Sequence, residues 1–148
     1  MCRTQNLVTV AEISSGRYSQ CVTVGRHILA ADEPESLGGH DTGPTSYEFL
    51  LAGLGACTEI TLQMYAERHN WALRRTTVKL QHEEIPAAEG TSRIDHFHRI
   101  IYLEGDLTED QRLRLFEIAG KCPVSETLRH AAIVESKLAG AVASQAQR

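Results

Sequence analysis

The feature that most constrains the fold of this chain is a helical pattern over residues 46–69 whose first half is apolar on every face. The stretch Tyr47-Glu-Phe-Leu-Leu-Ala-Gly-Leu-Gly-Ala-Cys57 carries a single charged side chain. A helix without a polar face is stable only when it is buried on all sides. Beyond Cys57 the pattern becomes amphipathic. The sequence therefore predicts a central helix over residues 46–70, around which the other elements pack.

Short alternating segments precede this helix and predict three N-terminal antiparallel strands within residues 7–31. β-branched residues alternate with polar ones over residues 7–13 and 18–24, and a third run covers residues 27–31 after a break at Gly25. Residues 35–45 then hold three glycines and a proline, so we expect an ordered loop that leads into the helix.

The second half of the chain combines a hairpin with two helices and a last strand. Alternation predicts a hairpin over residues 76–103, capping signals predict helices within residues 108–128, and β-branched residues predict a final strand over residues 131–139. The order β-β-β-α-β-β-α-α-β indicates an α+β fold with antiparallel sheets. At this length we expect a single domain over residues 1–148.

Charge and hydropathy exclude several classes of partner. The net charge is −4 and the basic residues are scattered, which argues against nucleic acid. The longest strongly apolar run, residues 49–57, is broken by two glycines and is far shorter than the about 20 residues of a membrane span. The first residues hold no apolar core of a secretory signal. We therefore expect a cytoplasmic protein without a membrane partner.

Four cysteines are the candidate chemical groups, and they are too few and too widely spaced for a disulfide scaffold. Cys2 lies near the terminus and Cys21 lies in a predicted strand, where packing explains it. Cys57 lies on the apolar helix. Cys122 directly precedes a predicted short helix, whose unpaired N–H groups would lower the pKa of its thiol. Spacing alone does not place Cys57 and Cys122 together.

Two sequence blocks resemble the family of osmotically inducible protein C and organic hydroperoxide resistance proteins (OsmC/Ohr). The first runs from Gly43 to Cys57, as Gly-Pro-Thr-Ser-Tyr-Glu-Phe-Leu-Leu-Ala-Gly-Leu-Gly-Ala-Cys, and is similar to the segment that opens the family's central helix. The second, Lys121-Cys-Pro-Val-Ser125, is similar to its second cysteine block. The resemblance implies an OsmC-like fold, with antiparallel sheets wrapped around long central helices in an intertwined homodimer and active sites at the subunit interface.

The resemblance also implies a chemistry, that of a thiol-dependent peroxidase. In this reading Cys57 attacks the O–O bond of an organic hydroperoxide, and Cys122 resolves the resulting sulfenic acid to a disulfide. An external dithiol then reduces the pair. The cycle requires no cofactor. The local capping argument would favour Cys122 as the thiolate, and we follow the family order here because tertiary charges can outweigh a local cap.

The resemblance extends to two charged residues that would assist the thiols. Glu48 matches the carboxylate that the family uses to position its catalytic arginine, although it could equally be a first-turn acid that complements the helix dipole. No arginine occurs at the family's position, where this chain has residues 30–34. Arg17 and Arg26 are the nearest upstream candidates, and we select Arg26.

Three other readings of the sequence remain open. His96 and His98 share one strand face at a spacing that some zinc sites use. A histidine such as His69 or His130 could activate a cysteine for acyl transfer. The chain could also be a non-enzymatic dimeric protein that binds small molecules or senses redox state, with the cysteines lining an interface cleft.

Overall fold

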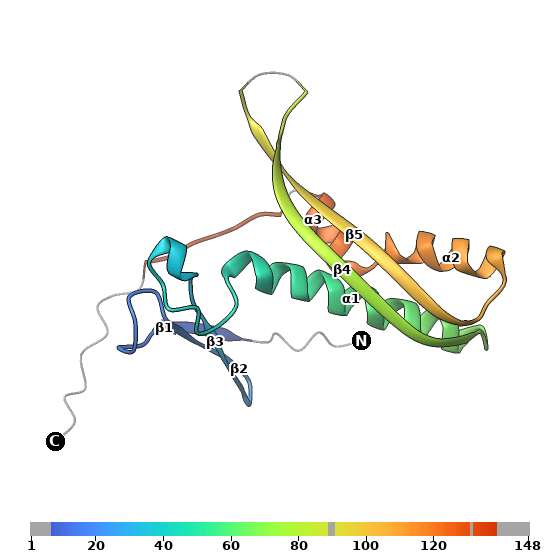
Figure 1. The fold of residues 1–148 in the computed structure, drawn as a ribbon, viewed down its shortest axis with the longest axis horizontal. Helices are drawn as coiled ribbons and strands as arrows, with labels where there is room; N and C mark the ends of the chain where they lie inside the picture. Colours follow the sequence, from blue (N-terminus) through green and yellow to red (C-terminus); the bar gives the residue numbers. More distant parts are fainter. Residues whose placement is uncertain (1–6, 89–90, 131, 139–148) are drawn as a thin grey trace.

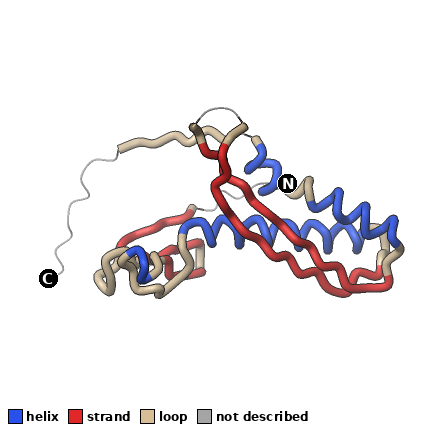
Figure 2. The backbone as a smooth tube through the Cα atoms, turned by 45° about the horizontal axis from the view of Figure 1, so that its top comes forward, coloured by secondary structure: helices blue, strands red, loops and turns tan. Residues whose placement is uncertain are grey.

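A long helix forms the centre of the molecule, as Figure 1 shows for the computed structural model, which describes residues 7–88, 91–130 and 132–138. This helix, α1, spans Ser46–Arg68. A two-stranded hairpin crosses one side of α1, and two shorter helices pack on it from another direction (Figure 2). A small three-stranded sheet lies at the N-terminal end of α1 (Figure 1). The α+β architecture predicted from the sequence is confirmed.

The N-terminal sheet consists of β1 (Val8–Glu12), β2 (Gln20–Val24) and β3 (His27–Ala31). All three strands are antiparallel, and β2 lies between the other two. The turn between β2 and β3 requires a positive φ, which Gly25 supplies at 58°. The three strands expected within residues 7–31 are therefore present.

The loop between β3 and α1 is held by the carboxylate of Asp32, whose residue is 4 % exposed. It accepts hydrogen bonds from the Thr42 hydroxyl at 2.7 Å, from the Ser19 hydroxyl at 3.0 Å and from three backbone N–H groups of the loop. The Thr42 hydroxyl is the main reason that the pKa of Asp32 lies well below its usual range, despite burial. These bonds fix the point at which α1 begins.

Helix α1 begins with a capping box and buries only one of its faces within the chain. Thr45 and Glu48 cap its first turn reciprocally. Its fully buried residues form a single row with i, i+4 spacing, which consists of Leu54, Thr58, Leu62 and Ala66. The remaining faces carry apolar side chains that a single chain leaves exposed or half-buried.

By length and composition, α1 is also apolar enough to cross a membrane, with 22 % of the relevant window buried. This differs from the expectation based on its short uninterrupted apolar run. One such helix is weak support for a membrane span, because the core helix of a soluble protein has the same composition. In this fold, α1 is the helix against which β4, α2 and α3 pack.

The hairpin is longer than the predicted residues 76–103. Its strands, β4 (Ala72–Pro86) and β5 (Arg93–Asp106), pair antiparallel along their whole length, with a bulge between Leu73 and Arg75. Where the hairpin crosses α1, a Cβ at Gly55 would lie 2.9 Å from a methyl group of Leu80. Glycine at this position therefore permits close packing of the strand on the helix.

The two C-terminal helices, α2 (Glu109–Ala119) and α3 (Pro123–Arg129), agree with the predicted residues 108–128. Helix α2 packs against the C-terminal half of α1 and then leads the chain back towards the middle of α1 (Figure 1). Cys122 follows as the N-cap of α3. The core cluster between the helices consists of Leu62, Ala66, Leu115, Ile118 and Ala119.

The final strand expected over residues 131–139 is not formed within the chain. Residues 132–138 belong to no helix or strand, and residues 131 and 139 lie outside the described part. The apolar side chains of this segment have no packing partner, since Ile133, Val134 and Leu138 are 90 %, 88 % and 101 % exposed. A strand needs a neighbouring strand for its backbone hydrogen bonds, and none of the described strands pairs with this segment.

Candidate active site

Folding brings Cys57 and Cys122 together, although they lie far apart in the sequence. Cys57 is on α1, and Cys122 is carried to it by the path of α2. Each thiol alters the pKa of the other through a side-chain contact. Both are free cysteines, as is Cys21 in β2, whereas Cys2 lies outside the described residues. Two thiols in contact form the centre of the candidate site.

The Cys57 thiol is half-buried and has a pKa above its ordinary value. The main cause is burial, which disfavours the charged thiolate, and the neighbouring Cys122 adds to this effect. The backbone N–H of Val124 and the side chain of Thr61 both favour the thiolate, but together they do not reverse the shift. Cys57 therefore favours the neutral thiol.

The Cys122 thiol is fully buried and yet has a pKa below its ordinary value. Burial by itself would raise the pKa, but several groups favour the thiolate more strongly. The Thr58 hydroxyl lies 3.6 Å from Sγ, and the backbone N–H of Ser125 also bonds to the sulfur. The Cys57 thiol and the positive charge of Arg99 act in the same direction.

The Arg99 guanidinium reaches the site through Thr58. Its Nη1 donates a hydrogen bond of 2.8 Å to the Thr58 hydroxyl oxygen, which in turn lies beside the Cys122 sulfur. Sequence reasoning did not select either residue. The sequence feature that could have identified Arg99 is the alternation of side chains along β5. Arg99 lies on the same half-buried side of the strand as Phe97 and Ile101. A charged residue at such a position needs a partner inside the fold.

A cavity of about 410 Å³ is bordered by Arg99, although neither Thr58 nor either cysteine lines it. Leu54, Phe97, Phe116 and Leu128 supply its apolar walls, while Arg99 contributes the guanidinium. Other polar side chains at its border are those of Asp95, Ser125 and Arg129. A cavity that combines apolar walls with convergent polar groups can bind a small molecule that has an apolar part and a polar group.

Two cysteines in contact, on a central helix and at the start of a short C-terminal helix, form the arrangement that the family resemblance implied. The sequence profile described as OsmC-like protein matches residues 39–137, which includes both cysteines. The chain belongs to the OsmC-like family. No curated protein matches it closely in sequence.

Solved structures of other OsmC-like proteins share the fold at low sequence identity. The organic hydroperoxide resistance protein OsmC of Legionella pneumophila is 18 % identical, with a TM-score of 0.67 over 87 % of this chain and 92 % of that one. An OsmC-like protein of Mycoplasma pneumoniae is 16 % identical, with a TM-score of 0.68 over 86 % and 89 %. OhrB of Bacillus subtilis is 19 % identical, with a TM-score of 0.63 over 86 % and 93 %.

Within the described part of the single chain, neither of the two charged residues expected from the family resemblance bonds to a cysteine. The carboxylate of Glu48 accepts hydrogen bonds from the backbone N–H of Thr45 at 2.7 Å and from its hydroxyl at 3.0 Å. Glu48 therefore caps the first turn of α1, in agreement with its second reading as a first-turn acid of the helix. Arg26 lies in the turn between β2 and β3, and no hydrogen bond or ion pair among the described residues joins it to either cysteine.

We expect Glu48→Gln to leave the fold nearly unchanged, and the rate at which the cysteine pair reacts with a hydroperoxide to stay within about twofold of wild type, because glutamine also completes a capping box. The Thr45 N–H and hydroxyl lower the pKa of Glu48. Its contribution to stability is therefore present above the ordinary glutamate pKa and lost as pH falls through the lowered value. Melting temperatures of the two proteins should converge at acid pH. A large loss of that reaction rate in Glu48→Gln would instead place Glu48 among the residues that act on the thiols.

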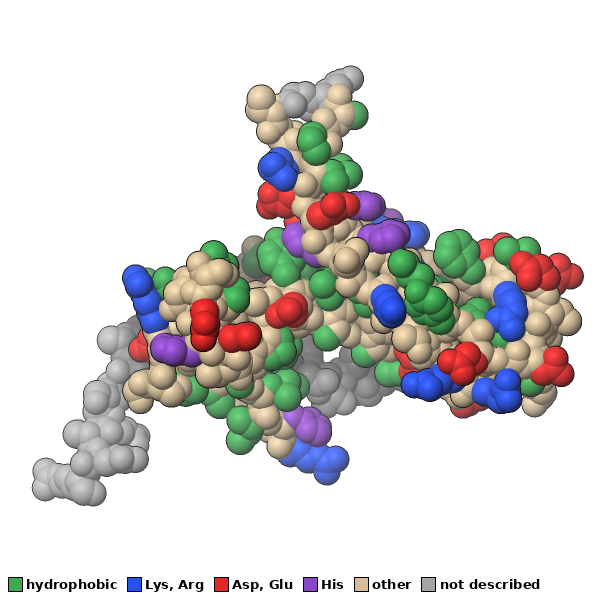
Figure 3. Space-filling view, in the orientation of Figure 1, with side chains coloured by type: hydrophobic (Ala, Val, Ile, Leu, Met, Phe, Trp, Pro, Cys, Tyr) green, Lys and Arg blue, Asp and Glu red, His purple; other side chains and the backbone are tan. Residues whose placement is uncertain are grey.

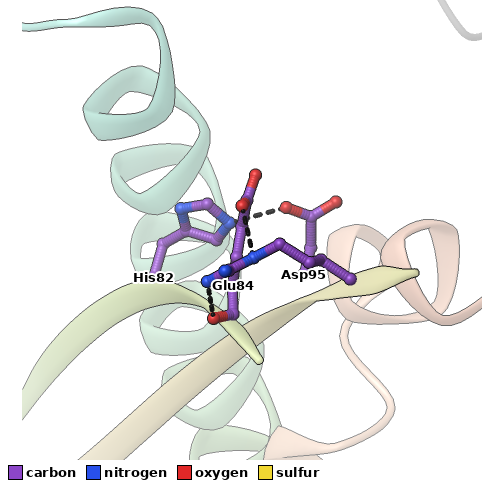
Figure 4. A network of polar contacts seen from close by, with 4 residues as sticks. His82, Glu84 and Asp95 are labelled. Atoms are coloured by element: carbon purple, nitrogen blue, oxygen red, sulfur yellow. Dashed lines mark hydrogen bonds and ion pairs between the residues drawn. The ribbon is translucent and has the colours of Figure 1, made fainter. Parts of the chain in front are cut away.

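Several histidine side chains gather on the hairpin, while others lie apart from it (Figure 3). Each of two histidines bonds to a carboxylate, His82 to Asp95 at 2.7 Å and His96 to Glu83 at 3.0 Å. Figure 4 shows His82 and Asp95 pointing towards each other beside Glu84. Within the described residues, no group of three or more potential ligands is arranged to hold a metal ion. The zinc-site reading of His96 and His98 gains no support.

The two histidines considered for acyl transfer are engaged with their own helices. His69 Nδ1 bonds to the backbone oxygen of Tyr65, and His130 Nδ1 bonds to that of Glu126, each at 2.8 Å. In the described part of the chain, neither ring bonds to a cysteine. The structure therefore gives no cysteine–histidine pair of the kind that activates a nucleophile for acyl transfer.

Proposed function

We propose that this OsmC-like protein is a thiol-dependent peroxidase that reduces organic hydroperoxides through a disulfide between Cys57 and Cys122. The observation that supports it is the contact between these two free thiols, one of which has a lowered pKa, beside a hydroxyl bound by a guanidinium. A thiolate next to a second thiol is the arrangement that a two-cysteine redox cycle requires.

The proposed cycle uses three reactants, which are the hydroperoxide, the cysteine pair and an external dithiol. A thiolate attacks the terminal oxygen of the hydroperoxide, so that the O–O bond breaks, an S–O bond forms and the alcohol leaves after taking up a proton. The second thiol then attacks the sulfenic sulfur, which forms the disulfide and releases water. An external dithiol reduces the disulfide by exchange and is itself oxidised. Only thiol chemistry is needed.

The names of two structural neighbours support the same substrate class, since those of Legionella pneumophila and Bacillus subtilis are organic hydroperoxide resistance proteins. The apolar walls of the cavity beside Arg99 suit the carbon chain of such a substrate. We also propose a cytoplasmic location, where cellular reductants keep cysteines such as these as thiols.

We propose Arg99, in place of Arg26, as the arginine that assists the reaction. Its guanidinium borders the cavity and bonds to Thr58, whereas Arg26 lies in the β2–β3 turn. A fixed positive charge beside the reacting atoms stabilises the thiolate and the negative charge that develops on the leaving oxygen. This chain would thus supply the family's guanidinium from a different strand.

We further propose that two chains form an intertwined homodimer with the sites near its interface. The outer face of α1 carries Gly53, Ala56, Ile60 and Met64 at helical spacing, all exposed in the single chain. Small residues on such a row let a second helix approach closely. The unpaired segment at residues 132–138 would become the predicted final strand once a sheet of the partner lies beside it.

The direct test of the proposed function is a thiol count. Wild-type protein treated with an excess of an alkyl hydroperoxide should lose two of its four thiols per chain and regain them with a dithiol. Peptide mapping should place the disulfide between Cys57 and Cys122. The matched control is the Cys21→Ser variant, which should lose the same two thiols.

Other outcomes would support other functions. Retention of all four thiols would end the peroxidase proposal and favour a binding protein whose cysteines line a cavity. A stable thioester after incubation with an activated acyl donor, without peroxide consumption, would favour acyl transfer. Incomplete loss of thiols accompanied by intermolecular disulfides would argue against the proposed pairing.

A further inference from the structure

Thr58 is the polar member of the buried row of α1, and it is 0 % exposed. Its hydroxyl oxygen lies 2.7 Å from the backbone oxygen of Leu54, 2.8 Å from Arg99 Nη1 and 3.6 Å from Cys122 Sγ. These partners come from α1 itself, from β5 and from the start of α3. A buried hydroxyl costs free energy unless it is hydrogen-bonded. Thr58 therefore joins the three elements that meet at the cysteine pair.

The chemistry of the partners fixes the role of each contact to the Thr58 hydroxyl. A hydroxyl has one proton to donate and two lone pairs that accept. The Leu54 carbonyl can only accept and the Arg99 guanidinium can only donate, which leaves the second lone pair for the S–H proton of Cys122. When that proton leaves, the hydroxyl can turn its own proton to the sulfur while Arg99 still holds its oxygen. The contact is thus available to the thiol and to the thiolate.

A second threonine, Thr61, lies beside the other sulfur and has different partners. Its hydroxyl donates to the backbone oxygen of Cys57 at 2.7 Å, and its side chain also contacts the Cys57 thiol. Thr61 is half-buried, and in the described part of the chain its side chain bonds neither to Arg99 nor to Cys122. Of these two threonines, Thr58 is the one that links a sulfur to the guanidinium.

The two sulfurs also differ in how a reactant can reach them. Cys57 is half-buried, whereas Cys122 is 0 % exposed. A hydroperoxide that arrives from outside therefore meets Cys57 first, in agreement with the order that the family resemblance implies. Cys122 can act only on an atom that is already inside the site. The side-chain contact between the two thiols makes the sulfur of Cys57 that atom.

We propose that Thr58 is the positioning residue for disulfide formation. With its oxygen held by Arg99, it keeps the Cys122 sulfur directed at Cys57, so that a sulfenic acid formed on Cys57 is resolved. This inference rests on the proposed peroxidase function. In this step the Cys122 thiol attacks the sulfenic sulfur, the S–S bond forms and the S–O bond breaks. The hydroxyl group of the sulfenic acid leaves as water with the proton of Cys122.

The test separates the two steps of one turnover with one equivalent of tert-butyl hydroperoxide. Thr58→Val keeps the size of the side chain and removes the hydroxyl. We expect its peroxide consumption to stay within about threefold of wild type and its disulfide formation, followed as loss of the second thiol after acid quench, to slow about tenfold, because a hydrogen bond that aligns the sulfurs is lost. Dimedone should then trap a sulfenic acid on Cys57. Disulfide formation at the wild-type rate, or equal slowing of both steps, overturns the inference.

Two further variants make the result specific to the hydroxyl of Thr58. Thr58→Ser keeps the hydroxyl and should restore the rate of disulfide formation. Thr61→Val removes the hydroxyl beside the other sulfur, so it can change peroxide consumption but should leave disulfide formation within about twofold of wild type. Circular dichroism establishes that each variant is folded. Slow disulfide formation in Thr58→Ser, or in Thr61→Val to the same extent as in Thr58→Val, overturns the role of Thr58.

Failure of the inference is distinguishable from failure of the proposed function. If the wild type and Thr58→Val form the disulfide equally fast, the peroxidase proposal stands and only the role of Thr58 is wrong. If the wild type keeps its thiols with hydroperoxide, the function itself fails. Diamide oxidises paired thiols to a disulfide without a peroxide, so the same variants compared with diamide still decide the role of Thr58. Arg99 variants are unsuitable for this test, because the guanidinium is also proposed to stabilise the leaving oxygen.

Discussion

Replacing Arg99 with alanine should lower the second-order rate constant for organic hydroperoxide reduction by about 10²- to 10³-fold, the range seen when one preorganised donor to a developing negative charge is removed. The guanidinium bonds to Thr58 and favours the Cys122 thiolate by its charge. Its loss would reduce both the thiolate population and the stabilisation of the leaving oxygen. Stopped-flow measurement of peroxide consumption under excess dithiol gives this constant directly.

Two further arginine variants make the Arg99 result specific. Arg99→Lys keeps the charge but not the planar fork, so it should recover only part of the rate. Arg26→Ala compares the arginine expected from the sequence with the one that the fold places beside Thr58. We expect Arg26→Ala to retain wild-type rates. The opposite ranking, with Arg26→Ala inactive and Arg99→Ala active, would show that Arg26 reaches the thiols by a route absent from the single chain.

The sequence predicted the elements well where local chemistry determines them. The α2 helix begins after a capping box of Thr108 and Gln111, and α3 begins at Pro123, both as expected. The hairpin extends beyond its predicted ends, to Ala72 and Asp106. The sequence did not predict this extension, because the residues near the strand ends are mostly polar. Pairing with the facing strand, and not the side-chain pattern, decides where a strand ends.

The candidate site was only half predictable from the sequence. The cysteine pair followed from the resemblance, since no rule of local spacing brings a residue of α1 to the start of α3. Arg99 and Thr58 were missed because their roles depend on how β5 crosses α1, which is a tertiary property. Thr58 did carry a signal, as the polar member of an otherwise apolar buried row that includes Leu54 and Leu62.

The burial predicted for α1 is confirmed only in part. The pattern predicted a helix buried on every side, but α2, α3 and the hairpin cover one row of α1 and leave much of the opposite side exposed. Exposed apolar side chains in one contiguous row favour a second protein surface. The row that contains Ile60 and Met64 is therefore the part of the chain on which the dimer proposal depends.

The substitution Ile60→Glu should dissociate the proposed homodimer. Ile60 is 54 % exposed in the single chain and lies in the middle of the outer row of α1. If a partner helix covers it, Ile60→Glu buries an unpaired carboxylate, at a cost of about 3 kcal/mol or more, which corresponds to about a hundredfold weaker association. Sedimentation equilibrium at micromolar concentration should then find one chain where wild type has two.

The matched control for Ile60→Glu is Gln111→Glu. It adds the same charge to a helix, but at the third position of α2, where glutamate completes a capping box with Thr108 as well as glutamine does. This variant should remain a dimer with wild-type stability. A monomeric wild type, or an Ile60→Glu protein that stays dimeric, would remove the basis for helix-to-helix association through α1. The thiol chemistry of the pair could still stand in that case, because every contact that defines it lies within one chain.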